Sequence, residues 1–240
     1  MWFSLALLSS SVFIDVNVLF VTKILTKAED FAALVIPQGT YSGQKNFLNT
    51  GYYIVGNDID CTGFTTASDK AYPMWDQNVG FRGTFDGNGK TISNLTVDRN
   101  GLFGQIGKGA VIKNVTFDKV TYKNTVSTAL LAFAIKGATI ENITINVASY
   151  ATYTHSEAFS PEHGLLSSRY LQNNTITNVT IHAEGFAIGS LFGRVENSNT
   201  YTNVAIYAKS YKYLGDETDS NPFNSHTELP AGVTFVADAA

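Results

Sequence analysis

Gly101-Leu102-Phe103-Gly104 and Ile112-Lys113-Asn114-Val115-Thr116-Phe117 form a pair of phrases that decides the fold, because the pair returns three more times. Counterparts of the first phrase begin at 129, 164 and 190, so successive repeats begin 28, 35 and 26 residues apart. The second phrase has the counterparts Ile140–Ile145, Ile176–Ile181 and Tyr201–Ile206. Self-similarity at such periods is typical of a solenoid, in which each unit buries its apolar face against its neighbours.

The second phrase predicts a bend in the chain. Ile112 and Val115 are three residues apart, so one straight strand cannot bury both. A bend at Asn114 restores the alternation, because Asn tolerates the left-handed conformation and its amide bonds neighbouring backbone. A further copy, Ile92–Val97, begins only 20 residues before Ile112, which leaves room for three short strands. Stacked coils should place five asparagines above one another at a structural corner: Asn94, Asn114, Asn142, Asn178 and Asn203.

The fold class expected from these patterns is all-β, a single-stranded parallel β-helix with a short N-terminal capping helix. The helix is expected over 24–36, where Thr26 and Glu29 form a capping box and Pro37 ends the apolar stripe. The longer repeat periods are interpreted as coils with insertions, and 231–236 as a last strand or the start of another domain.

The expected organisation has four parts. Residues 1–23 form a leader or an N-terminal strand, since Trp2–Leu8 resembles a signal core without its basic flank, whereas Ser11–Val21 alternates like a strand. Residues 24–50 form the capping helix and entry loop, 51–210 the β-helix, and 211–240 a C-terminal loop and strand. We expect a monomeric module of a larger chain that does not insert into a membrane.

Composition excludes several classes of function. Charged residues make up 15% of the chain and the net charge is −4. Because no basic cluster exists, binding to nucleic acid or to anionic membranes is not expected. Cys61 is the single cysteine, which rules out an intrachain disulfide and is typical of a small buried hydrophobe. No cofactor is expected.

Possible catalytic or metal sites are weak in this sequence. Asp86-Gly87-Asn88-Gly89 starts like a calcium loop, but Lys90 and Val97 break the pattern, so a turn is favoured. Sequons such as Asn142-Ile-Thr144 coincide with the corner phrase and are interpreted as structural. The best polar cluster, interpreted mainly as a solvated loop, consists of His155, Glu157, Glu162, His163 and Arg169.

Aromatic side chains give a second kind of candidate site, because exposed rings can stack on sugars. The aromatic residues considered are Trp75, Tyr150, Tyr153, Tyr207, Tyr211 and Tyr213. Of these, Trp75, Tyr211 and Tyr213 are predicted to contact a ligand, while others cover the solenoid.

Residues 81–97 and 101–117 together resemble the GLUG-motif repeat of bacterial surface proteins, and Tyr52–Asp60 resembles the segment that precedes it. The resemblance extends over 25–206 and is most specific at 51–117. It implies a secreted or surface-attached protein of gut-type bacteria, in a family whose members are mostly adhesins or of unknown function. Some members accompany peptidase domains, but the repeat itself implies no catalytic residues.

Three functions follow as hypotheses. The first is a non-catalytic extracellular module that binds a glycan or a host surface protein. The second is a polysaccharide lyase or hydrolase, which would need clustered acids on adjacent coils. The third is a structural spacer. An aligned acid cluster favours the enzyme, a continuous aromatic strip favours glycan binding, and a uniform Thr/Asn/Lys surface favours the spacer.

Overall fold

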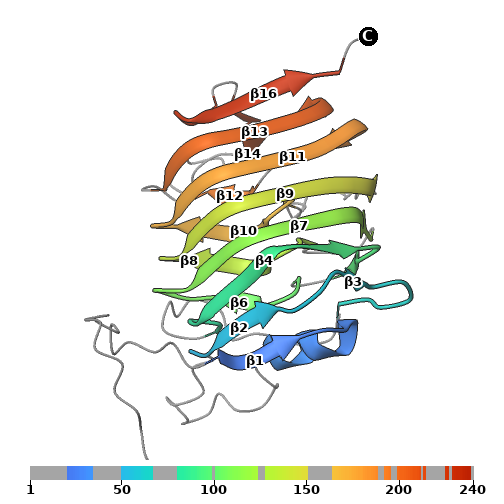
Figure 1. Ribbon diagram of the computed structural model, residues 1–240. Helices are drawn as coiled ribbons and strands as arrows, with labels where there is room; N and C mark the ends of the chain where they lie inside the picture. Colours follow the sequence, from blue (N-terminus) through green and yellow to red (C-terminus); the bar gives the residue numbers. More distant parts are fainter. Residues whose placement is uncertain are drawn as a thin grey trace, which may run out of the picture.

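The computed structural model describes residues 21–34, 50–66, 80–98, 101–123, 128–150, 164–188, 192–195, 199–211, 213–214, 225–226 and 229–238. These residues form a parallel β-solenoid, in which long strands stack along one face and shorter strands lie behind them (Figure 1). The predicted all-β parallel fold is therefore confirmed.

The larger sheet has ten strands, and its main path runs β1-β2-β4-β7-β9-β11-β13-β16, with β3 beside β4 and β5 beside β7. All of its pairings are parallel. The strands are β1 Val21–Leu25, β2 Tyr52–Val55, β3 Ile59–Asp60, β4 Thr84–Ser93, β5 Thr96–Val97, β7 Val111–Tyr122, β9 Thr139–Tyr150, β11 Thr175–Ile188, β13 Thr200–Tyr211 and β16 Val233–Ala237.

A second, four-stranded sheet is also parallel and has the order β12-β10-β8-β6. Its strands are β6 Gly104–Ile106, β8 Ala132–Lys136, β10 Ser167–Gln172 and β12 Phe192–Val195. From β6 to β13 the chain alternates between the two sheets, so each of these coils adds one short and one long strand. A small antiparallel pair joins β14 Tyr213–Leu214 to β15 Ser225–His226.

The core lies between the sheets and consists of aligned apolar columns. Ile112 pairs with Ile140 and Ile140 with Ile176, and all three side chains are fully buried. A second fully buried column runs from Ile92 through Phe117, Ile145, Ile181 and Ile206. Because each layer covers the next, the core extends through every coil rather than forming one central cluster.

The predicted capping helix over 24–36 is wrong. β1 ends at Leu25, and a 3-10 helix, Ala28–Leu34, follows it. Three residues per turn place Ala28, Phe31 and Leu34 on one face, and all three are buried. Asp30, rather than the expected Glu29, closes the turn, because its Oδ2 accepts hydrogen bonds from the N–H groups of Thr26 at 2.8 Å and Lys27 at 3.2 Å.

Both ends of the larger sheet extend beyond the range of 51–210 given to the β-helix. β1 pairs with β2, and β16 pairs in parallel with β13, so the strand expected at 231–236 belongs to the solenoid. The suggested leader or strand within 1–20 lies outside the described residues.

Candidate functional site

The long strands bend at an asparagine on the outer face of the larger sheet. Asn114, Asn142, Asn178 and Asn203 have φ values of 56°, 55°, 53° and 53°. Asn tolerates this left-handed region better than most residues with a side chain. The bend lets the residues on both sides of it point inward, as in β9, where Ile140 is 0% and Ile143 is 1% exposed.

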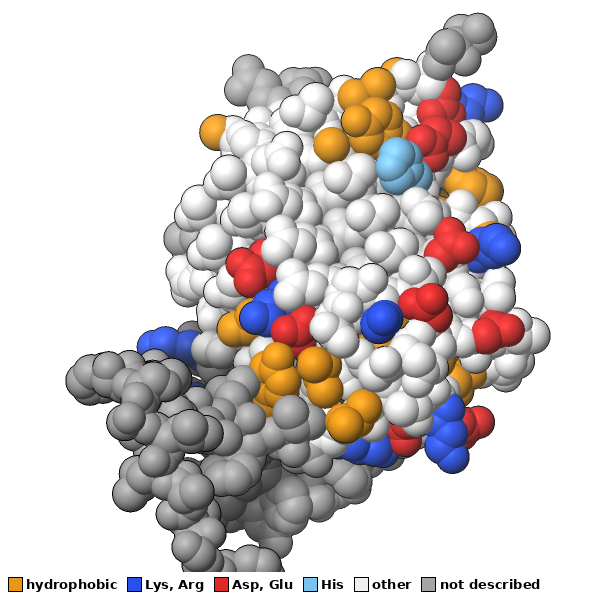
Figure 2. All heavy atoms as spheres, in the orientation of Figure 1, with side chains coloured by type: hydrophobic (Ala, Val, Ile, Leu, Met, Phe, Trp, Pro, Cys, Tyr) orange, Lys and Arg blue, Asp and Glu red, His pale blue; other side chains and the backbone are white. Residues whose placement is uncertain are grey.

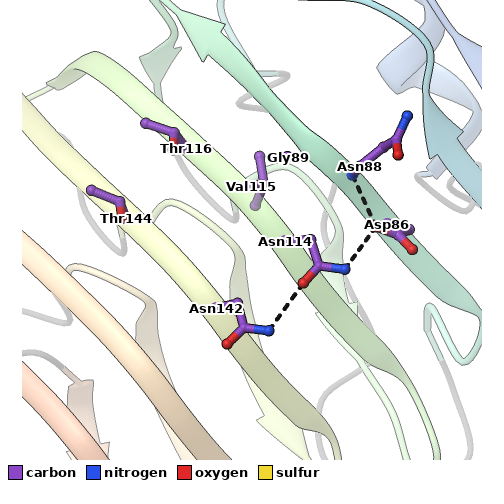
Figure 3. Close-up of a pocket in the computed structure, with 8 residues that line it drawn as sticks. All are labelled: Asp86, Asn88, Gly89, Asn114, Val115, Thr116, Asn142 and Thr144. Atoms are coloured by element: carbon purple, nitrogen blue, oxygen red, sulfur yellow. Dashed lines mark hydrogen bonds between the residues drawn. The ribbon is translucent and has the colours of Figure 1, made fainter.

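These four asparagines and Asp86 form a continuous row of side-chain hydrogen bonds, which we call the amide ladder. In each step a side-chain Nδ2 donates to the Oδ1 of the preceding coil. The distances are 2.9 Å from Asn203 to Asn178, 3.0 Å from Asn178 to Asn142, 3.0 Å from Asn142 to Asn114 and 3.1 Å from Asn114 to Asp86. Figure 3 shows the last two steps. All donors point the same way, and a carboxylate is the final acceptor.

Asp86 is the charged end of the amide ladder. Its Oδ1 accepts the Asn114 amide and the Asn88 backbone N–H at 2.9 Å, and its Oδ2 accepts the Tyr52 hydroxyl at 2.9 Å. Lys113 lies 3.7 Å from Oδ2. Burial opposes ionisation of Asp86, but these hydrogen bonds and the Lys113 charge outweigh it and lower its pKa. Burial and the bond to Asp86 raise the pKa of Tyr52.

The glycine-rich segment after Asp86 is a bulge within β4. Asp86 pairs with Lys113 and Lys90 with Val115, so Gly87-Asn88-Gly89 occupies the place that a single asparagine takes in β7. A Cβ on Gly87 would lie 2.4 Å from the Asn114 carbonyl oxygen, which explains why glycine is required there. Within the described part of the chain, no group of three or more His, Cys, Asp or Glu side chains is placed to hold a metal ion.

The prediction that Asn94 belongs to the same column is wrong. Ile92 pairs with Phe117, whereas the partner of Ile112 is Phe85. The copy of the phrase that starts at Ile92 therefore lies further along its coil than the copies in β7 and β9. Asn94 therefore marks a second bend, with φ of 57°, and its Nδ2 donates to Asp60 Oδ1 at 2.9 Å. In the neighbouring coil, Asp118 is the register partner of Ser93, so Lys119 takes the place that Asn94 has in its own coil. Lys119 also has a positive φ, of 54°.

A hollow of about 410 Å³ opens on the outer face at the corner, across β4, β7 and β9. It is lined by Asp86, Asn88, Gly89, Asn114, Val115, Thr116, Asn142 and Thr144 (Figure 3). Its threonines belong to a register column that runs beside the amide ladder and contains Thr91, Thr116, Thr144 and Thr180. The polar groups of the lining are thus amides, hydroxyls and a single carboxylate, and Gly89 and Val115 complete it.

The outer face around the hollow carries little charge. In Figure 2 uncharged polar side chains and backbone cover most of it, and the charged groups are scattered. Lys113 stands between Asp86 and Glu141 in one register column, so its charge is compensated along the column. Thr177 and Thr202 continue that column. Among the described residues, the register columns of this face carry no excess of positive charge, unlike an anion-binding surface.

The predicted ligand-binding aromatics are not brought together by the described residues. Trp75 lies outside them, Tyr211 ends β13 beside Ile188, and Tyr213 begins β14 opposite His226. Their role in ligand binding stays a prediction.

Two other aromatic candidates have structural partners. Tyr150 is 9% exposed and its ring centroid lies 5.4 Å from that of Tyr122, so it packs in the core. Tyr207 stacks on His182 at 4.9 Å and 9° on the outer face. Tyr153 lies outside the described residues.

The polar cluster suggested by the sequence lies mostly outside the described residues. His155, Glu157, Glu162 and His163 lie outside the described residues, and Arg169 is placed in β10 by its backbone. Cys61 is fully buried, and burial, with smaller contributions from Asp60 and Glu29, raises its pKa to about 12. Its interpretation as a small buried hydrophobe is confirmed.

Two structural features escaped the sequence analysis. Asp86 ends the amide ladder. Its pairing with Lys113 is not evident from the sequence, because the bulge that follows Asp86 interrupts the match between the two phrases. Asn174, 1% exposed, accepts the Ala138 N–H at 2.8 Å and donates to Asn199 Oδ1 at 3.0 Å between the two sheets. Only two coils carry this second amide pair, so no repeated pattern signals it.

Comparison with known proteins found similarity to a peptidase family model and to halomucin, each over part of the chain. The family model for the N-terminal region of M26 IgA1-specific metallo-endopeptidases matches residues 44–147. Halomucin of Haloquadratum walsbyi (strain DSM 16790 / HBSQ001) is 42% identical over 71 residues, which cover 27% of this chain and 1% of halomucin. The chain thus spans about 1% of that relative's length. No solved structure gave a significant match.

The part of the chain matched by the peptidase model includes all the residues of β4, β7 and β9 that line the hollow. The match concerns a β-helical N-terminal region, and the GLUG resemblance stays a prediction. Within the described ranges, no helix is long and apolar enough to cross a membrane.

Proposed function

We propose that this chain is a non-catalytic β-solenoid module of a secreted or cell-surface protein, and that its outer face binds an extracellular glycan or host surface protein. The observation that carries the proposal is the polar hollow at the corner, which sits on a hydrogen-bonded floor. The similarities to the peptidase N-terminal region and to halomucin support an extracellular context.

The floor of the hollow suits binding because it is held in place before a ligand arrives. Asn114 and Asn142 are fixed by the amide ladder, and Asp86 is fixed by three hydrogen bonds. A preorganised site loses less conformational entropy when it binds. The fixed floor therefore favours a binding surface over a face that becomes ordered only with its partner.

A structural spacer is the second candidate, and it also has an observation in its favour. The amide ladder and the adjacent column of Thr116, Thr144 and Thr180 are made of Asn and Thr, the kind of polar surface expected of a spacer. A continuous aromatic strip, which would favour glycan binding by stacking, does not occur among the described residues of these columns.

The hydrolase alternative receives less support. Glycoside hydrolysis commonly uses two carboxyl groups on either side of the scissile bond. Asp86 is the one carboxyl group among the residues lining the hollow, and its two oxygens already accept hydrogen bonds. The proposed module is therefore non-catalytic at this hollow.

A glycan array tests the binding proposal. The folded protein is applied across a concentration series, with heat-denatured protein as the control for nonspecific adsorption. Dose-dependent binding by the folded protein to one glycan class supports the proposal. If the array is blank, binding to immobilised host surface proteins is measured by the same titration, and failure in both formats leaves the spacer.

A further inference from the structure

We infer that the corner hollow is a subsite for a neutral glycan chain, which lies across β4, β7 and β9 and bonds through its hydroxyl groups. The inference rests on the proposed binding function and names its ligand class. The hollow provides hydrogen-bond donors and acceptors on two adjacent columns, one of asparagines and one of threonines.

The asparagines of the hollow keep hydrogen-bonding capacity after the ladder has formed. A side-chain amide has two N–H donors and an oxygen with two lone pairs. Asn142 donates one bond to Asn114 and accepts one from Asn178. Asn114 likewise donates one bond, to Asp86, and accepts one from Asn142. Each amide therefore retains one donor and one acceptor position for a ligand.

The threonines supply the second column of polar groups. The hydroxyls of Thr116 and Thr144 have no protein partner among the described residues, and both side chains are half-buried at the wall of the hollow. Because a hydroxyl both donates and accepts, it suits a sugar hydroxyl, which does the same. Thr116 and Thr144 are neighbours in the parallel register, so the amide and hydroxyl pair repeats from one coil to the next.

The charge of the hollow selects a neutral ligand. Asp86 is the one acidic group of the lining, and Lys113 pairs with it at 3.7 Å. No arginine or lysine lines the hollow, so a sulfated or carboxylated sugar would lose hydration without gaining a cationic partner. Adjacent parallel strands are about 4.8 Å apart, so a linear chain along the solenoid axis meets an equivalent set of groups at each coil.

The test uses affinity gel electrophoresis of the whole chain with neutral polysaccharides (mannan, laminarin and dextran) and anionic ones (heparin and polygalacturonate). The variant is Thr116→Val/Thr144→Val, which removes both hydroxyls while keeping β-branched side chains that suit a strand. The matched control is Thr180→Val, in the same column but outside the lining. Thermal melting of each variant verifies that it folds.

We expect at least one neutral polysaccharide to retard the native protein, and the double variant to weaken that binding about tenfold or more through two lost hydrogen bonds. The Thr180→Val control should stay within about twofold. Retardation by the anionic polysaccharides alone, or neutral binding that the folded double variant retains, overturns this subsite and leaves the proposed binding function standing. Absence of retardation by all five also overturns the subsite, and the array and host-protein titrations then decide the function separately.

Discussion

Replacing Asn142 by alanine should destabilise the solenoid at the centre of the amide ladder. The substitution removes one hydrogen bond donated to Asn114 and one accepted from Asn178, each 3.0 Å long. A net loss of about 0.5–1.5 kcal/mol per bond gives about 1–3 kcal/mol. Alanine at φ of 55° adds about 1 kcal/mol, because its Cβ disfavours the left-handed region. Since this corner is exposed, we expect a total of about 2–3 kcal/mol.

Urea denaturation followed by circular dichroism measures this loss, and thermal melting gives a second reading of about 5–10 °C for a chain of this size. Asn142→Gly separates the two contributions, because glycine accepts the positive φ but still lacks the amide. We expect Asn142→Gly to be more stable than Asn142→Ala by about 1 kcal/mol. Thr202→Ala, at an exposed position beside Asn203, is the control and should change stability by less than about 0.5 kcal/mol. A loss below about 0.5 kcal/mol in Asn142→Ala would refute the structural role of the ladder.

Three further predictions concern stability. Lys119→Asn should stabilise the protein by about 0.5–1 kcal/mol in urea denaturation, because Lys119 has φ of 54°, and an unchanged midpoint contradicts this. The pKa of Asp30 is lowered to about 2 by the Lys23 ammonium, whose Nζ lies 2.8 Å from Oδ1, and by backbone hydrogen bonds. The ionised Asp30 carboxylate therefore stabilises the fold above about pH 4, and this contribution is lost as the pH falls toward 2. Asp30→Asn should therefore cost about 1–2 kcal/mol at pH 7 and flatten the acid decline of a pH series of melts, whereas an unaltered decline argues against the ion pair. Gly87→Ala should lower the free energy of unfolding by about 2–3 kcal/mol in urea denaturation, because the new Cβ meets the β7 backbone. Gly89→Ala should lower it by about 1 kcal/mol, because open space surrounds Gly89 and only its positive φ opposes alanine. Equal losses in the two variants would contradict the close approach at Gly87.

The repeated phrase was sufficient to predict the solenoid and the left-handed bends, because both follow from local rules. Alternation of apolar residues sets the inward positions. An asparagine sets the bend where two inward residues are three positions apart instead of two. At Asn114, Asn142, Asn178 and Asn203 this reasoning matches the geometry that the structure shows.

The errors arose where a tertiary partner overrides the local pattern. Asn94 carries the same phrase as the ladder asparagines, but this copy of the phrase starts at the end of β4, where Ile92 pairs with Phe117. Asn94 therefore lies at a different bend of the coil. Glu29 fits a capping box, yet the Asp30 carboxylate reaches back to the Thr26 N–H and ends the strand in a 3-10 turn. Sequence spacing gives no information on which of two neighbouring carboxylates reaches the backbone.

The candidate site was less predictable than the fold. Aromatic residues are the ligand contacts expected from the sequence, whereas the polar side chains that line the hollow are those of Asn, Thr and one Asp. Those side chains come from strands that are 28 residues apart at Asn114 and Asn142, so the hollow exists only once the register is known. Its members were recognised in the sequence as structural residues, and their shared surface was not.

The arrangement of side chains on the outer face depends on the parallel register of the coils, and a cysteine cross-link tests that register directly. Thr144 and Thr180 are register partners on adjacent strands, whereas Thr116 and Thr180 are separated by the strand between them. Cys61 is fully buried with a pKa of about 12, so it should not compete for oxidation. The account predicts that the folded Thr144→Cys/Thr180→Cys variant forms an intramolecular disulfide under mild oxidation and that Thr116→Cys/Thr180→Cys does not. Efficient cross-linking of the second pair, or failure of the first, would contradict the register and with it the proposed surface.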